Sequence, residues 1–137
     1  MSSVVMDASV WVARLVPQDA FHTAVRDWLD VQRAYETLLA APGLLLAEVA
    51  GAVRRRTGDR DLAKQCIAVL QGLPEVRLVE MDRLLMQHAA DLAAQHGLRG
   101  ADACYVAVAA SLNIPLATLD DDQRQRAASL VQIYSFS

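Results

Sequence analysis

The sequence lacks any apolar run of membrane-spanning length. A transmembrane helix needs about 18 or more consecutive apolar residues. The two longest apolar stretches, 38–53 and 101–119, are each interrupted by a proline and an acidic residue. The N-terminus begins with a strand-like segment and has no basic region of the kind that opens a signal peptide. We therefore expect no signal peptide and no membrane partner.

Cysteine is also scarce. The two cysteines, Cys66 and Cys104, each lie inside an apolar helical pattern, which is typical of reduced core thiols. Reduced thiols predict a cytoplasmic protein, and a disulfide is the less favoured alternative. With 137 residues, 54% of them hydrophobic, the chain is long enough to bury a core without disulfides or a structural metal. We therefore expect a single domain over residues 1–137.

Positive charge is limited, and lysine is almost absent. The net charge is −3 and the pI is near 5.5, so the overall electrostatics do not indicate nucleic-acid binding. The basic residues are twelve arginines and one lysine, Lys64. One guanidinium can bind two phosphate oxygens at once, which would explain the excess of arginine over lysine by function. Genomic base composition can also enrich arginine, so both explanations stay open.

Four acidic residues are present where solvated acids are not expected, in apolar surroundings. They are Asp7 after Val4-Val5-Met6, Glu48 within 44–50, Asp102 before the apolar run 103–108, and Asp120 after 115–119. Burying an unpaired carboxylate costs free energy, so such acids are usually paired, neutralised or bound to a metal. Basic partners are scarce in all four segments, which favours a divalent cation. An oxygen-rich site of this kind suits Mg²⁺ or Mn²⁺ and phosphate chemistry.

Short apolar strands alternate with helical patterns along the chain. We expect strands at 4–7, 38–41, 76–81, 114–118 and 130–134, and helices at 8–16, 20–35, 44–56, 59–71, 82–96, 100–112 and 121–128. This alternation predicts an α/β fold with a mostly parallel sheet flanked by helices. Ligands of such sheets bind at the carboxyl ends of the strands. Asp7 and Asp120 fall at strand ends and Asp102 in a first helical turn, so we expect the acids to converge there.

Each acid also has a plain structural explanation. The three aspartates can cap the helices that follow them. Glu48 can form an ion pair with Arg54 or Arg55 on the same helix. All four explanations must hold together for the shared site to disappear, so the site is favoured.

Four further residues are auxiliary candidates. Ser9 and Thr118 are placed to orient a carboxylate or a metal-bound water, and Asp122 to reach a metal through water. Arg99 is a candidate phosphate contact, as are the arginines at 54–56. Each of these residues is also ordinary as a surface or first-turn residue.

Four short segments carry the acids in a fixed order: Val-Val-Met-Asp7-Ala-Ser9, Leu-Ala-Glu48-Val-Ala-Gly-Ala-Val-Arg-Arg-Arg, Ala-Asp102-Ala-Cys-Tyr-Val-Ala-Val-Ala and Leu-Ala-Thr118-Leu-Asp120. Each segment alone is a weak signal, but the ordered set is specific and spans the chain. It resembles the PIN-domain nucleases, and most closely the VapC toxins of bacterial toxin–antitoxin pairs.

The resemblance implies a PIN-like three-layer sandwich, with a central mostly parallel sheet flanked by helices. It also implies an endoribonuclease dependent on Mg²⁺ or Mn²⁺, an RNA substrate, a homodimer and a cognate VapB-like antitoxin. Its catalytic and metal-binding residues would be Asp7, Glu48, Asp102 and Asp120. The run 120–122 leaves the fourth acid assignable by register only; the spacing from Thr118 favours Asp120 and leaves Asp122 auxiliary.

The expected chemistry is attack of a metal-activated water on a phosphodiester, with the cation also relieving charge on the transition state. For the antitoxin, we expect a helix to dock on apolar surface near Trp11, Val12 and Leu15 and to present an arginine to the acids.

Other functions fit the sequence less well. A phosphoaspartyl receiver needs a lysine at the end of a late strand, whereas Lys64 lies in a helix. A haloacid-type phosphatase needs a second aspartate where Ser9 stands. No serine–histidine or cysteine–histidine arrangement indicates covalent catalysis. A free-standing RNA-processing PIN nuclease and a non-catalytic RNA-binding PIN protein remain alternatives, although the intact set of acids argues against the second.

Overall fold

In residues 2–134 and 136, which the computed structural model describes, five parallel strands form one sheet in the order β3-β2-β1-β4-β5. The strands are β1 (Ser3–Met6), β2 (Leu38–Pro42), β3 (Val76–Val79), β4 (Leu116–Ala117) and β5 (Ile133–Tyr134). The central strand β1 pairs with β2 on one side and β4 on the other. The carboxyl ends of β1 and β4, followed by Asp7 and Asp120, therefore lie near each other at one edge.

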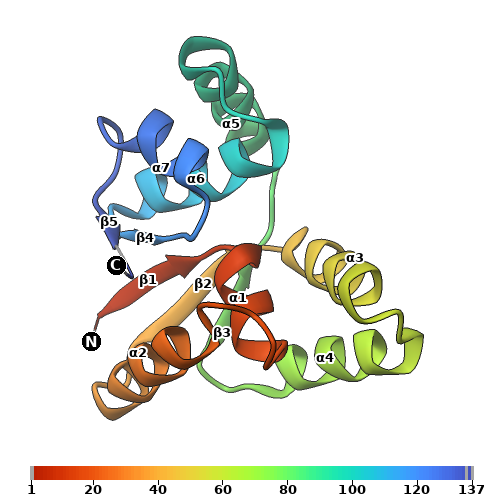
Figure 1. Cartoon of the computed structure of the whole chain (residues 1–137). Helices are drawn as coiled ribbons and strands as arrows, with labels where there is room; N and C mark the ends of the chain where they lie inside the picture. Colours follow the sequence, from red (N-terminus) through yellow and green to blue (C-terminus); the bar gives the residue numbers. More distant parts are fainter. Residues whose placement is uncertain (1, 135, 137) are drawn as a thin grey trace.

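Helices cover both faces of this sheet. They are α1 (Ala8–Leu15), α2 (His22–Ala34), α3 (Leu45–Thr57), α4 (Arg60–Gly72), α5 (Arg83–His96), α6 (Gly100–Leu112) and α7 (Asp121–Ala127). Figure 1 shows α1 to α4 on one side of the sheet and α5 to α7 on the other. On the second side α6 packs on β1, β2 and β4, and α5 packs on α6. The arrangement is the predicted three-layer α/β sandwich.

Side-chain caps explain where several helices begin. Aspartate side chains accept a hydrogen bond from a first-turn backbone N–H in α1, α4, α5 and α7, through Asp7, Asp59, Asp82 and Asp120 respectively. Two helices end at a glycine in the left-handed conformation: Gly58 after α3 and Gly97 after α5. The positive φ of 68° at Gly97 would strain any other residue there, and an added Cβ would also displace the Arg126 guanidinium, which lies 2.6 Å from its position.

The predicted strands and helices are confirmed, but the late strands are shorter than predicted. In the segment predicted as a strand at 130–134, the N–H groups of Leu130 and Val131 both donate to the carbonyl of Ala127. These residues therefore form the turn that ends α7, and only Ile133 and Tyr134 pair with β4. Near 80–82 the chain leaves the sheet because Asp82 begins α5.

The core lies between the sheet and the two helical layers. Val5 and Met6 of β1 are fully buried, as is the α6 segment 105–109 apart from traces of surface, because α6 lies between the sheet and α5. The thiols of Cys66 and Cys104 are free and buried, as predicted. Among the residues that the structure describes, every helix is too short or too polar to cross a membrane.

Candidate active site

The four predicted acids line one cavity of about 300 Å³ at the carboxyl edge of the sheet. Asp7 directly follows β1, and Asp120 lies close after β4. Asp102 lies in the first turn of α6 and Glu48 in the first turn of α3. Ser9, Arg99 and Tyr105 complete the polar lining. We refer to this cavity as the acid pocket. The convergence expected from the strand ends is therefore present.

Asp7 is the most buried of these acids, and both of its oxygens accept hydrogen bonds. Oδ1 accepts from the Ser9 hydroxyl at 2.6 Å and from the Val10 backbone N–H at 3.3 Å. Oδ2 accepts from the Thr118 hydroxyl at 2.5 Å. Burial raises the pKa of Asp7 to about 6, although these hydrogen bonds oppose the rise. Asp7 is thus a helix cap and a pocket acid at once, and Ser9 and Thr118 orient it.

Glu48 is held by a residue that the sequence did not single out for this role. The Tyr105 hydroxyl donates to Glu48 Oε1 at 2.6 Å, in place of the ion pair with Arg54 or Arg55 considered from the sequence. Tyr105 is almost completely buried, and burial and then this hydrogen bond raise its pKa, so the phenol stays neutral and donates. The sequence does contain a signal that places Tyr105 at the site. Tyr105 follows Asp102 by three residues, and residues three apart lie on the same face of a helix.

Arg99 joins two of the acids. Its Nε donates to Asp102 Oδ2 at 3.3 Å, and its Nη2 donates to Asp120 Oδ2 at 2.6 Å. The pKa of Asp102 is nevertheless raised, first by burial and then by the negative charge of Asp120. The pocket therefore concentrates negative charge that one arginine only partly offsets.

Gln123 is a second residue that sequence reasoning missed. Its side chain is fully buried. Its Nε2 donates to the Asp102 carbonyl at 3.3 Å, its Oε1 lies 2.9 Å from the Thr118 hydroxyl, and its backbone N–H donates to Asp120 Oδ1. A glutamine three residues after a capping aspartate is a capping-box pattern. Here the side chain instead links the starts of α6 and α7.

The Thr118 hydroxyl connects these groups. It accepts from the Asp120 backbone N–H at 3.0 Å and lies within hydrogen-bond distance of two acceptors, Asp7 Oδ2 and Gln123 Oε1. Its single proton serves one of them at a time. Protonation or amidation of Asp7 would let both acceptors be satisfied, which connects the charge of Asp7 to the packing around Gln123.

Asp122 lies outside the acid pocket. Its carboxylate is half-exposed and accepts from Arg126 Nε at 2.9 Å. Asp120 instead lines the pocket. The two side chains point to different surroundings because Asp120 caps α7, whereas Asp122 lies within its first turn.

The chemistry of the donor set fits a hard divalent cation, since four carboxylates and two hydroxyls line the pocket. In the conformations adopted here, however, no three histidine, cysteine, aspartate or glutamate side chains within residues 2–134 and 136 are grouped closely enough to hold one ion. The side chains are instead directed to protein partners: Asp7 to Ser9 and Thr118, and Glu48 to Tyr105. A cation would have to compete for these oxygens.

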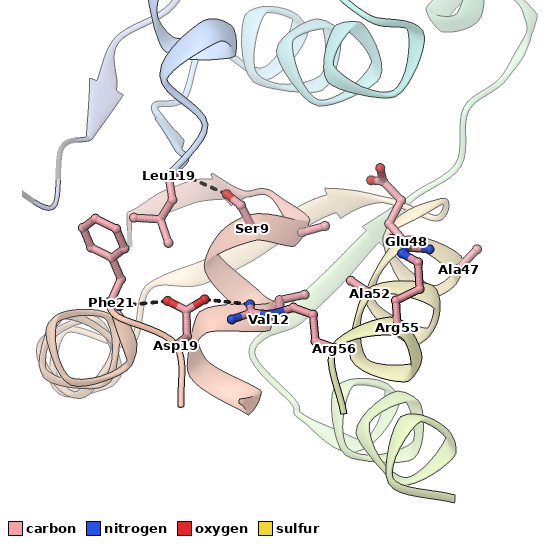
Figure 2. A pocket seen from close by; sticks show the side chains of 11 residues that line it. Ser9, Val12, Asp19, Phe21, Ala47, Glu48, Ala52, Arg55, Arg56 and Leu119 are labelled. Carbon is pink, nitrogen blue, oxygen red and sulfur yellow. Dashed lines mark hydrogen bonds and ion pairs between the residues drawn. The ribbon is translucent and has the colours of Figure 1, made fainter. Parts of the chain in front are cut away.

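A larger groove of about 630 Å³ adjoins the acid pocket and shares Ala8, Ser9 and Glu48 with it. Figure 2 shows Glu48 and Arg55 of α3 on one wall and Phe21 on the other. Phe21 is 42% exposed. Arg56 forms an ion pair with Asp19 at 2.7 Å, so both of these charges have a partner. The groove therefore combines an apolar wall with charged side chains.

The apolar docking surface expected on α1 needs correction. Trp11 is only 3% exposed and Val12 only 5%, because α1 is covered by α2 and α3. Leu15 is partly buried. The accessible apolar surface of this region is instead the groove wall that includes Phe21.

Comparison with known proteins agrees with this arrangement. The PIN domain family model matches residues 4–129. Ribonucleases VapC45 and VapC49 of Mycobacterium tuberculosis are each 31% identical to the chain over 115 residues, which cover 84% of the chain and 80% of the relative.

Solved structures share the fold. The M. tuberculosis VapC20 structure, described as a sarcin-ricin loop cleaving toxin, has a TM-score of 0.80 at 22% identity, over 96% of this chain and 99% of that one. FitAcB from Neisseria gonorrhoeae has a TM-score of 0.69 at 22% identity, over 97% of each chain. VapBC2 from Rickettsia felis, bound to a promoter DNA fragment, has a TM-score of 0.72 at 14% identity, over 96% and 97%. Together with the family match and the relatives, this means that the chain belongs to the PIN-domain family and, within it, to the VapC ribonucleases.

Proposed function

We propose that this protein is an endoribonuclease that cleaves RNA phosphodiester bonds with a divalent cation, and that it is the toxin of a VapBC-type pair. The observation that carries the proposal is the convergence of Asp7, Glu48, Asp102 and Asp120 on one pocket. The ribonuclease relatives at 31% identity support the reaction class. We further propose that residues 1–137 act as one PIN-like domain, since the family match covers most of them.

The four carboxylates are the residues that would hold Mg²⁺ or Mn²⁺. When bound, such an ion lowers the pKa of a coordinated water and neutralises charge on the phosphate oxygens. Asp120 Oδ2 and Asp102 Oδ2 become available only when Arg99 moves, because both now accept from it.

The remaining pocket residues hold the acids in position. Ser9 and Thr118 fix Asp7 from opposite sides. Tyr105 restricts Glu48 through one oxygen and leaves the other for a ligand. Because the pKa of Asp7 is about 6, its carboxylate is mostly charged at neutral pH and neutral in mild acid. Protons and the cation would therefore compete for Asp7, and at a metal concentration below saturation we expect cleavage to weaken as the pH falls through about 6.

An antitoxin is the proposed protein partner. Several structural neighbours are toxin–antitoxin complexes, including VapBC2 from Rickettsia felis and a complex from Klebsiella pneumoniae. The groove beside the acid pocket offers apolar surface at Phe21 and the carboxylate of Glu48. An inhibitory helix lying there would bring an arginine to the acids, in competition with the cation. We also propose a homodimer, as the family resemblance implies.

The test uses purified protein and structured RNA substrates, including tRNA and rRNA fragments. Cleavage is expected with Mg²⁺ or Mn²⁺ and is expected to stop with EDTA. Asp7→Asn and Asp102→Asn should each abolish it while keeping the fold, because the amide preserves shape but loses charge. Asp122→Asn, outside the pocket, is the matched control and should cleave normally. Wild-type rates in either pocket variant would remove that residue from the mechanism.

Co-expression with the small open reading frame next to the gene tests the pairing. Co-purification and relief of growth arrest would support a toxin. Metal-dependent cleavage without co-purification and with harmless expression would point to a free-standing RNA-processing nuclease. Binding of RNA without cleavage under all metal conditions would point to a non-catalytic PIN-fold protein.

A further inference from the structure

Arg99 occupies one carboxylate oxygen on each of two acids of the pocket. Asp120 Oδ1 is already engaged as the cap of α7, since it accepts from the Gln123 backbone N–H at 3.0 Å. Oδ2 is therefore the oxygen of Asp120 left for another ligand, and Arg99 bonds to it at 2.6 Å. The same guanidinium also bonds to Asp102 Oδ2. One side chain thus fills the bridging position between two pocket acids.

The position of Arg99 allows its side chain to leave. The side chain is 68% exposed, whereas those of Asp102 and Asp120 are 17% and 26% exposed. Ion pairs of such an exposed arginine are weak, because water screens the charges. Arg99 is the N-cap residue of α6, yet its side chain makes no capping hydrogen bond. Gly100, next in the chain, has open space around its α-carbon. Releasing the guanidinium therefore breaks the exposed ion pair with Asp102 but no capping hydrogen bond of α6.

We propose that Arg99 is an internal counter-ion, which pairs with Asp102 and Asp120 in the metal-free protein. A divalent cation displaces the Arg99 side chain from these acids, and the released guanidinium then binds a phosphate of the substrate. The inference rests on the proposed function, because it assumes a cation and RNA at this pocket. The exchange follows from charge: a guanidinium and a cation compete for the same carboxylate oxygens. Once released, the guanidinium remains beside the pocket and matches the geometry of two phosphate oxygens.

The contrasting role for Arg99 is that of a structural brace that holds Asp102 and Asp120 ready for the cation. The two roles predict opposite effects on metal affinity. Removing a competing counter-ion tightens metal binding, whereas removing a brace weakens it. Metal affinity measured without RNA therefore separates them.

The experiment measures Mn²⁺ binding to the full chain by titration calorimetry, without RNA. Arg99→Gln is compared with wild type and with Arg124→Gln. Arg124 is the matched control, because it pairs with Asp121 at 2.7 Å on the adjacent α7 and removes the same charge without touching the pocket. We expect Arg99→Gln to bind Mn²⁺ about fivefold more tightly and Arg124→Gln to change affinity less than about twofold. A melting curve checks that Arg99→Gln is folded. If the folded variant binds Mn²⁺ as tightly as wild type or more weakly, the counter-ion role is overturned.

A second measurement addresses the phosphate. With saturating Mn²⁺, Arg99→Gln should raise KM for RNA about tenfold with a smaller change in kcat, and Arg99→Lys should fall between it and wild type. Tighter Mn²⁺ binding with an unchanged KM would overturn the phosphate role. If the wild-type protein cleaves no RNA, the proposed function fails, but the Mn²⁺ comparison still decides whether Arg99 is a counter-ion.

Discussion

Replacing Asp7 by asparagine should stabilise the metal-free protein at neutral pH. The folded protein holds this carboxyl with a pKa of about 6, compared with an ordinary value of 3.8. The difference of about two pH units corresponds to about 3 kcal/mol at neutral pH, since each unit is worth about 1.4 kcal/mol. The sign follows from proton binding. Between these two pKa values the folded state binds more protons than the unfolded state, so stability falls as the pH rises through this window and then levels off.

Asparagine also fits the surrounding contacts. Its carbonyl can accept from Ser9 and Val10, as Asp7 Oδ1 does. Its amide can donate to the Thr118 hydroxyl, which would then donate to Gln123 Oε1 and satisfy both groups. The carbonyl oxygen and the amide nitrogen would thus each keep a hydrogen-bond partner, although only one of the two amide N–H groups gains an acceptor among these contacts.

The assay is urea denaturation in EDTA at several pH values between 4 and 8, for wild type, Asp7→Asn and Asp122→Asn. At each pH the free energy of unfolding of Asp7→Asn is subtracted from that of wild type. This difference should fall by about 3 kcal/mol at most between pH 4 and pH 7. Asp122 is half-exposed, so its variant should show no comparable trend. A difference between wild type and Asp7→Asn that stays constant with pH would refute the argument that burial raises the pKa of this acid.

Three further outcomes are expected. Tyr105→Phe removes the hydroxyl that holds Glu48, and should reduce metal-dependent cleavage by about 10- to 100-fold while the melting temperature falls only slightly; wild-type cleavage would show that Glu48 needs no such support. Gln123→Leu leaves the Asp102 carbonyl without its buried donor, and should lower the free energy of unfolding by about 1–3 kcal/mol in urea titrations; an unchanged midpoint would argue against this contact. Mn²⁺ at about 100 times its Kd should raise the free energy of unfolding of wild type by about 2.7 kcal/mol, and a melting curve indifferent to millimolar Mg²⁺ and Mn²⁺ would count against a metal site.

Much of the fold and the composition of the pocket can be predicted from the sequence. Apolar strands that alternate with helical patterns specify a parallel α/β sheet. The apolar strands are buried within the sheet, and helices pack their apolar faces against it. Capping aspartates such as Asp59 and Asp82 mark helix starts, since a short carboxylate satisfies free N–H groups there. The positions of the acids can be predicted for a related reason: Asp7 and Asp120 follow apolar strands, and parallel strands bring their carboxyl ends to one edge.

Only the tertiary structure decided which side chains meet within the pocket. The hydrogen bond from Tyr105 to Glu48 spans 57 positions, and that from Thr118 to Asp7 spans 111. Local patterns carry no information about such pairs, because they depend on how α6 and β4 pack beside α3 and β1. The same holds for the burial of Trp11, which α2 and α3 together produce. Sequence periodicity determines which face of an element is apolar, but the neighbours packed around that face determine which polar groups find partners.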